Sequence, residues 1–239
     1  SSTGASTLNN VTLDVNLTVN NGATLTLLNG LTLANGHSLT LAGAGNNTYL
    51  QFNGSQTIGG SGEIVFGGTA AGNAVVPTAA NTTLTLGSGV TVHGSQNGTF
   101  RDFTGLAGID TSYVNQGIID ADTAGKSISL YGNWSNTGTL GASAGTLNLY
   151  NNWSTAGLGT WDSTGGTIYF RGVLDNSGTV LGQGSSTGLI NLSGSTVNNG
   201  TIAGGVQLAS DGSNTFNGVT LDTDLTVLNG MTLTLLNGL

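Results

Sequence analysis

The 239-residue sequence contains no cysteine, one proline and only three fixed positive charges. Without cysteine, neither a disulfide framework nor a thiolate metal site can form. The three cations are Arg101, Lys126 and Arg171, and the formal net charge is −8. Phosphate backbones and anionic membrane surfaces bind clustered basic residues, which this chain lacks, so nucleic-acid binding is excluded as a function class.

Long apolar runs are also missing. No run reaches the length that spans a bilayer, and the first residues lack the basic start and apolar core of a signal peptide. We therefore expect no membrane insertion, and we expect any export signal to lie outside this sequence.

Charged residues make up only 6% of the chain, whereas Gly, Asn, Ser and Thr are abundant. This composition would suggest disorder if the apolar residues were irregularly placed. Instead they alternate with polar residues in short bursts, separated by Asn-Gly pairs at 21–22, 29–30 and 35–36. Each burst predicts a short strand, and each Asn-Gly pair predicts a sharp turn. Because Asn-Gly is also a common hairpin turn, a meander of hairpins is the local alternative.

Residues 114–206 favour stacked coils over hairpins, because turn triplets that begin with Asn and end with Gly recur at 136–138, 176–178 and 198–200. Apolar residues recur between the turns in three columns: Ile119, Leu140, Trp161, Val180 and Ile202; Ile128, Leu147, Ile168 and Ile190, followed two residues later by Leu130, Leu149, Phe170 and Leu192; and Trp134, Trp153 and Leu174. Three columns per turn of about 20 residues predict a coil of about three short strands. Hairpins would not keep three columns in phase.

Stacking would join the apolar sides of neighbouring coils into one interior. We therefore predict an all-β parallel β-helix, or β-solenoid, of about 11 coils with roughly 19–23 residues each, which makes a rod on the order of 50 Å long. Strand alternation directs Ile128 and Leu130 inward and Ser129 and Tyr131 outward. An outward threonine ladder is expected at Thr139, Thr160, Thr179 and Thr201.

One 21-residue segment occurs twice. Residues 11–31 recur as residues 219–239, 208 positions later, and only four positions differ. We interpret residues 1–239 as a single solenoid segment that holds one 208-residue tandem unit and the start of the next. Residues 69–80 and 95–113 are less regular and are expected to leave the coil as loops, where binding residues often lie.

Several sequence segments resemble those of a known class of proteins: VTLDVNLTVNNGATLTLLNGLTL, GSGEIVFGG, TLTLGSGVTVHGS, WSNTGTLGASAGTLNLYNNWS and GGTIYFRGVLDNSGTV. The chain resembles the repetitive β-solenoid surface proteins of bacteria, of the filamentous-haemagglutinin and autotransporter-passenger kind. The resemblance implies a right-handed β-helix, secretion to the extracellular bacterial cell surface, and a role as stalk, adhesin or fibre. The chain shows no full haemagglutination-domain signature and no translocator domain.

The candidate ligand-binding residues lie on one predicted outer strip. Tyr131, Tyr150 and Arg171 align as an outward column, and Tyr169 lies one column over. An exposed aromatic strip beside an arginine suits sugar rings, although such residues also cover strand edges and pack on one another. The loop 95–113 adds two further candidates, Arg101 and Asp102, and contains Asp110 as well.

A second candidate is the pair Asp120 and Asp122, which share one side of a strand. Clustered carboxylates on an outer face act as acid and base, or hold calcium, in carbohydrate-active β-helices. However, the adjoining coils offer Ala142 and Ser143 where a third acid would help. A solvated outer face is the simpler interpretation of this pair.

No metal site is expected. Asp222 repeats the position of Asp14, but the first copy has Asn16 where the second has Asp224, and a metal site in a tandem unit should recur. His37 and His93 lie far apart in turn-like settings without a second His or a Cys.

The leading hypothesis is a non-catalytic protein without a cofactor, part of a very long exported bacterial surface protein, that serves as an adhesin shaft or an extracellular fibre subunit. Its expected partner is itself, through end-to-end stacking of terminal coils or neighbouring units, because an open coil presents an unpaired strand edge. Surface glycans are the other expected partner. The alternative is a carbohydrate-binding or polysaccharide-degrading β-helix.

Overall fold

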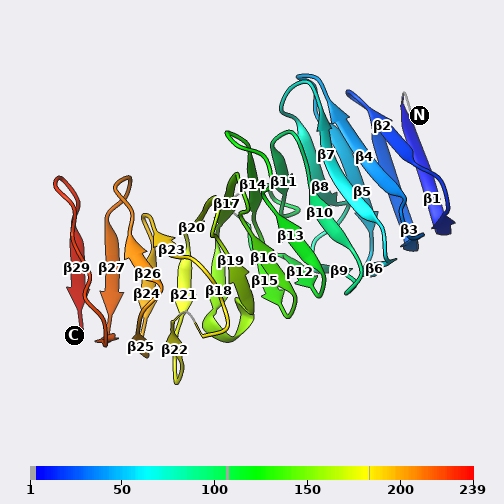
Figure 1. Cartoon of the computed structure of the whole chain (residues 1–239). Helices are drawn as coiled ribbons and strands as arrows, with labels where there is room; N and C mark the ends of the chain where they lie inside the picture. The colour runs from blue at the N-terminus through cyan, green and yellow to red at the C-terminus, as the bar shows by residue number, and fades with distance from the viewer. Residues whose placement is uncertain (1–3, 106–107, 183) are drawn as a thin grey trace.

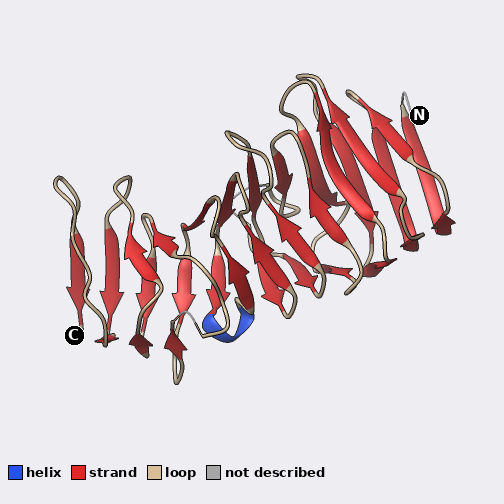
Figure 2. Cartoon of the chain, in the orientation of Figure 1, coloured by secondary structure: helices blue, strands red, loops and turns tan. Residues whose placement is uncertain are grey.

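The computed structural model describes residues 4–105, 108–182 and 184–239, which form strands, turns and one 3-10 turn, η1 (Thr155–Gly157). All pairings between the named strands are parallel, and the chain winds into about ten stacked turns, with its termini at opposite ends of the rod (Figure 1). The predicted parallel β-helix is therefore confirmed, with about ten turns against the expected 11. Within the described residues, no helix has the length and apolarity to cross a membrane. Figure 2 shows how little of the chain is helical.

Each turn visits three faces, which we call A, B and C in chain order. Face A begins with a seven-stranded sheet, and in the last turns its place in the coil is taken by a separate three-stranded sheet. The face A strands are β2 (Leu17–Asn20), β4 (Ser38–Gly43), β7 (Glu63–Gly68), β10 (Thr91–His93), β13 (Ile118–Asp120), β16 (Thr139–Gly141) and β19 (Thr160–Asp162), followed by β22 (Val180–Leu181), β25 (Thr201–Ile202) and β28 (Thr220–Leu221).

Face B is one unbroken ladder along most of the rod. It consists of the first half of β3 (Thr24–Leu33), β5 (Thr48–Asn53), β8 (Asn73–Pro77), β11 (Gly98–Phe100), β14 (Ser127–Leu130), β17 (Thr146–Leu149), β20 (Thr167–Phe170), β23 (Ile190–Leu192) and β26 (Val206–Leu208).

Face C begins with the second half of β3, which bends from one face to the next. Its other strands are β6 (Gln56–Gly60), β9 (Thr82–Leu86), β12 (Thr111–Asn115), β15 (Asn133–Asn136), β18 (Asn152–Ser154), β21 (Val173–Asp175), β24 (Thr196–Asn198), β27 (Asn214–Asn217) and β29 (Leu233–Leu236). At the N-terminal end, β1 (Ala5–Leu13) pairs with both halves of β3.

The Asn-Gly pair within β3 forms a corner of the coil instead of a hairpin. Asn29 and Gly30 have φ values of 57° and 98°, and the strand continues on the next face. Positive φ is accessible to Gly and tolerated by Asn, which explains why these residues occupy the bend.

The inward columns predicted from residues 114–206 are confirmed except at one position. The pairings Ile128 with Leu147, Leu147 with Ile168, and Trp153 with Leu174 place these side chains in register and out of solvent. Val180, however, is 58% exposed, and Leu181 points inward at 0%. A slip of one residue moves a side chain to the other side of a strand, so Leu181 is the residue that aligns with Ile202.

The threonine ladder is correct at Thr139 and Thr160, which are paired, but Thr179 does not belong to it. Thr201 pairs with Val180 because of the same slip, and the Thr179 hydroxyl donates a hydrogen bond to the Asn176 carbonyl at the corner.

The coil length expected from the sequence holds only in part of the molecule. In an early coil, Asn97 and Ser127 stand at equivalent positions of neighbouring turns and are 30 residues apart. By contrast, the equivalent residues Asn115 and Asn136 are 21 residues apart. In the first coils the strands are longer, with six residues in β4 and β5 against three or four in β16 and β17. The coil from Asn97 to Ser127 has strands of three, five and three residues, and its extra length lies in the segment between β11 and β12. The difference in strand length is visible along the rod in Figure 1.

The two expected loops are largely incorporated into the coil. Residues 73–77, within the expected loop 69–80, form β8, which pairs with β5 and β11. In the segment 95–113, residues 98–100 form β11 and the last three residues start β12, so its described residues outside strands are 95–97, 101–105 and 108–110. Leu106 and Ala107 lie outside the described residues. Alternating apolar residues such as Val75 (0% exposed) complete the interior, which favours the strand.

The recurrent Asn-x-Gly turns close the corner between face C and the next coil. Asn115, Asn136 and Asn176 are 0%, 1% and 0% exposed, and their side-chain amides bind backbone carbonyls of the following coil. The Asn115 amide also donates to the Asn136 side-chain oxygen at 2.8 Å. Because a buried amide must be satisfied, this asparagine ladder ties each turn to the next.

Candidate binding site on face B

Charge is distributed unevenly among the three faces. In the described part of the chain, no face B strand contains Asp or Glu, whereas face A strands carry Glu63, Asp120 and Asp162. All three fixed cations border face B: Arg101 follows β11, Lys126 precedes β14, and Arg171 follows β20.

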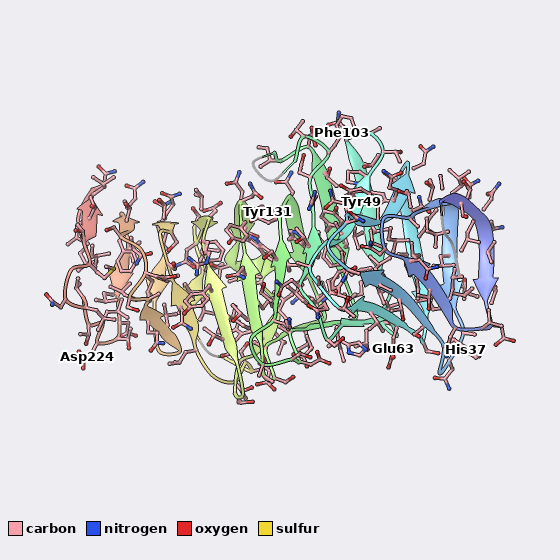
Figure 3. All side chains as sticks on the ribbon, turned by 90° about the horizontal axis from the view of Figure 1, so that it is seen from above. His37, Tyr49, Glu63, Phe103, Tyr131 and Asp224 are labelled. Atoms are coloured by element: carbon pink, nitrogen blue, oxygen red, sulfur yellow. The ribbon has the colours of Figure 1, made fainter. Side chains whose placement is uncertain are left out.

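Four of the five tyrosines also lie on or next to face B: Tyr49, Tyr131, Tyr150 and Tyr169. In Figure 3, Tyr49 and Tyr131 lie apart from His37 and Glu63, which are at the lower edge of the view. Face B therefore gathers the aromatic and cationic side chains of an otherwise acidic protein.

Tyr131 and Tyr150 follow β14 and β17 and stack on each other. Their ring centroids are 4.2 Å apart and the planes differ by 5°. Partial burial, and then the hydrogen bond to Tyr150, raise the pKa of Tyr131 to about 12, although the charges of Arg101 and Arg171 oppose this shift. The Tyr131 hydroxyl therefore stays protonated at neutral pH.

Arg171 comes one coil after Tyr150 and is held by several partners. Its guanidinium lies 4.5 Å from the ring centroid of Tyr169. The guanidinium donates to the Asn148 side chain at 3.1 Å, to the Ser193 hydroxyl at 2.6 Å and to Asp211 at 2.8 Å. With a side chain that is 24% exposed, Arg171 retains two N–H groups beyond these three contacts.

Arg101 is much less engaged. Its guanidinium lies 5.9 Å from the Tyr49 ring centroid, and among the described residues no carboxylate is within ion-pair distance of it. Its Nε is buried without a hydrogen-bond partner in the same part of the chain. Its backbone carbonyl is held by the buried Tyr113, whose hydroxyl donates to it at 2.5 Å.

Two hollows adjoin Arg101. One, of about 500 Å³, is lined by Tyr49, Gln51 and Phe103, and the other, of about 420 Å³, is lined by Asn73, Thr99 and other residues. The Arg101 side chain lines both hollows.

Asp102, a candidate ligand contact in the sequence, faces into its own loop. It is 2% exposed, and its carboxylate accepts hydrogen bonds from the Thr104 and Thr111 backbone amides at 3.2 and 2.9 Å. Burial by itself would raise the pKa of Asp102, but hydrogen bonds from Asp110 and these amides outweigh it and lower the pKa. The hydrogen bond with Asp102 raises the pKa of Asp110. This carboxyl pair anchors the turn after β11 and does not face the exposed tyrosine and arginine side chains of face B.

Face A contains a contact that the sequence reasoning missed. The His93 Nδ1 lies 2.8 Å from the Asp122 carboxylate, and its Nε2 lies 3.5 Å from the Glu63 carboxylate. The second distance permits an ion pair when His93 is protonated, but the geometry does not make a hydrogen bond. His93 and Asp122 are 29 residues apart and lie on neighbouring coils, whose strands β10 and β13 pair Thr91 with Ile118. The shorter coil that the sequence predicts does not bring them together, which is why the pair was missed.

The other carboxylates are also engaged or scattered. Asp120 accepts hydrogen bonds from the Ser143 backbone amide at 2.9 Å and from its hydroxyl at 2.7 Å. Asp14 lies 3.3 Å from the His37 Nε2. Over the described ranges, no group of three or more His, Cys, Asp or Glu side chains is arranged to hold a metal ion.

The three tryptophans belong to the interior, as predicted, with Trp134, Trp153 and Trp161 at 6%, 3% and 4% exposure.

No protein-family model, curated protein or solved structure matches this chain. The chemistry of the site therefore follows from its own side chains. Arg101, Tyr131, Tyr150 and Arg171 occupy successive coils along one corner of face B, with Tyr49 and Tyr169 beside the two arginines. The row presents phenol hydroxyls between two guanidinium groups, which is an arrangement of hydrogen-bond donors.

Proposed function

We propose that this protein is a non-catalytic structural segment of a long exported bacterial surface protein, serving as an adhesin shaft or an extracellular fibre subunit that assembles end to end. The observation that carries the proposal is the open apolar interior at the C-terminal end of the rod. Parallel coils stack on one another by extending the same sheets, so an open coil is suited to receive another coil.

The last coil continues the interior column of face C without covering it. Leu235 pairs in register with Phe216, which is 0% exposed, yet Leu235 itself is 49% exposed. In the same C-terminal segment, Val227, Leu236 and Leu239 are 46%, 48% and 59% exposed. Strand β29 has a partner on one side only. This end therefore presents both unpaired backbone groups and apolar side chains.

The N-terminal end offers a matching parallel edge. Strand β1 pairs only with β3, and β2 pairs only with β4, so both have one edge without a partner among the described strands. Because the two ends of the rod differ, contact between them is head to tail and repeats without closing, which produces a filament.

The test is negative-stain electron microscopy of the purified chain over a range of concentrations. We expect filaments for the wild type and separate short rods for Leu235→Lys, because a charge at the open interior opposes stacking. Val180→Lys is the matched control, since Val180 is similarly exposed but lies in β22, away from the last coil, and its filaments should persist. Monodisperse short rods at high concentration, with both end coils protected from amide exchange, would refute the proposal.

A second candidate function is carbohydrate binding on face B. It is favoured by the concentration of tyrosine and arginine side chains along that face, next to the two hollows at Arg101. A shaft that binds glycans along one side is compatible with end-to-end assembly, because the two use different surfaces.

A further inference from the structure

We propose that face B binds an acidic polysaccharide, a linear polymer of uronate sugars, through hydrogen bonds from the row Arg101, Tyr131, Tyr150 and Arg171. This inference rests on the proposal that face B binds carbohydrate and specifies the chemistry of the ligand.

The faces of the tyrosine rings are largely covered by other side chains of the protein, and this determines which groups of the row can contact a ligand. Tyr131 and Tyr150 cover one face of each other, and the guanidinium of Arg171 covers one face of Tyr169. What remains at the surface are phenol edges, hydroxyl groups and guanidinium N–H groups. A surface of donors selects ligands by their acceptors, and the strongest acceptors on a sugar polymer are carboxylates.

Local charge favours the same ligand. The net charge of −8 repels polyanions from the molecule as a whole, but all three fixed cations border face B and the face B strands have no carboxylate. Several carboxylates lie at the margin, among them Asp110, which is hydrogen-bonded to Asp102, and Asp224, which lines a hollow together with Tyr169. Asp102 is turned into its loop, and Asp211 is paired with Arg171. Arg101 is therefore the cation with the most capacity for an external anion, and its buried Nε lacks a partner within the described chain.

The repeat of the rod suits a polymer. Successive side chains of the row are one coil apart, which is about 4.8 Å along the axis, so the four positions extend over roughly 14 Å. A pyranose unit lengthens a polysaccharide by a distance close to one strand spacing, so successive sugar units of an extended chain fall near successive coils. Several weak contacts in register then add together.

The test measures binding of polygalacturonate to the full chain by biolayer interferometry, with carboxyl-reduced polygalacturonate as the uncharged match. We expect binding of the acidic polymer only, weakening as salt increases. Arg101→Gln should weaken it about tenfold, the usual effect of losing one charge-assisted hydrogen bond. Tyr150→Phe, which keeps the stacked ring and removes only the hydroxyl, should weaken it about threefold. Circular dichroism and thermal melting verify that each variant is folded.

The control is Asp14→Asn, which changes the net charge by one unit far from face B, at a side chain that is 82% exposed. It should leave binding unchanged, and strengthened binding would show that net charge, and not this row, determines the interaction.

Equal binding of the reduced and acidic polymers would overturn the acidic ligand but leave carbohydrate binding standing. Absence of binding to both would overturn the two together. If Arg101→Gln instead abolishes lateral association of rods in light scattering, face B is an interface between copies and the inference is wrong. None of these outcomes affects the test of end-to-end assembly.

Discussion

The same 21-residue segment, present at both ends of the chain, adopts two different places in the fold. In the first copy, Leu17–Asn20 forms β2 on face A, and the next burst forms the face B half of β3. In the second copy, residues 225–228 form no strand, and Leu233–Leu236 forms β29 on face C. Thus 17 identical residues of 21 do not determine which face a strand joins.

Burial differs as much as position. Val19 and Leu27 are 0% exposed, whereas their equivalents Val227 and Leu235 are 46% and 49% exposed. In the first copy, β3 lies between β1 and β5, whereas β29 in the second copy has a neighbouring strand on one side only. A strand in a solenoid is buried by the coils before and after it, so its stability depends on residues about one coil away in the sequence.

The turns behave in the opposite way and are the same in both copies. Asn29 and Asn237 have φ values of 57° and 56°, and each donates its side-chain amide to an asparagine of the preceding coil. Gly22 and Gly230 have φ values of 77° and 81°. Turn geometry is a local property of Asn and Gly, whereas strand placement is not.

The largest expected difference between the copies is at the buried valine. Val19→Asp places an unpaired carboxylate in the interior and should destabilise the protein by more than about 4 kcal/mol. Val227→Asp should change stability by less than about 0.5 kcal/mol, since its site is open to solvent. Urea denaturation of both variants measures this difference. Equal losses would mean that the second copy is as enclosed as the first.

A smaller and equal effect is expected at the turns. Asn29→Ala and Asn237→Ala each place alanine at positive φ, which costs about 1 kcal/mol, while glycine at either position should be nearly neutral. Because the last coil can open locally, amide exchange of the residues around each turn is the appropriate measurement. A loss confined to Asn29→Ala would show that the turn of the second copy is held by something other than its own residues.

The smallest effect concerns the coils that precede the second copy. Burial by itself would raise the pKa of Asp211, but hydrogen bonds from Ser193 and Arg171 outweigh it and lower the pKa. A lowered folded pKa means that the contribution of this contact is present above the ordinary value of 3.8 and is lost as the pH falls through the folded value. The effect should stay below about 1 kcal/mol, since the pair is partly exposed.

Amide exchange in β23 and β26 as the pH is lowered checks this expectation, after correction for the intrinsic rates. Asp211→Asn should remove the pH dependence and leave the first coils unchanged. An unaltered profile in that variant would assign the dependence to another group.

Much of the candidate site was predictable from the sequence, because alternation along strands places Tyr131, Tyr150 and Arg171 in one outward column and Tyr169 beside it. The role of Asp102 was not predictable, since its partners Thr104 and Thr111 are set by the path of the loop. The pairing of His93 with Asp122, 29 residues apart, depends on a coil longer than the predicted 19–23 residues, a length that no local pattern encodes.

By itself, the sequence determined most of the strands, the Asn and Gly turns, the inward columns between residues 114 and 206 except at Val180, and the outward row of tyrosines. These features depend on side-chain alternation and on backbone conformations that each residue can adopt alone. Only the tertiary structure decided the length of each coil, the face that each copy of the repeated segment joins and the charged contacts between coils. Those features depend on where one coil ends and the next begins, and a difference of one residue there reverses the side of a strand, as it does between Val180 and Leu181.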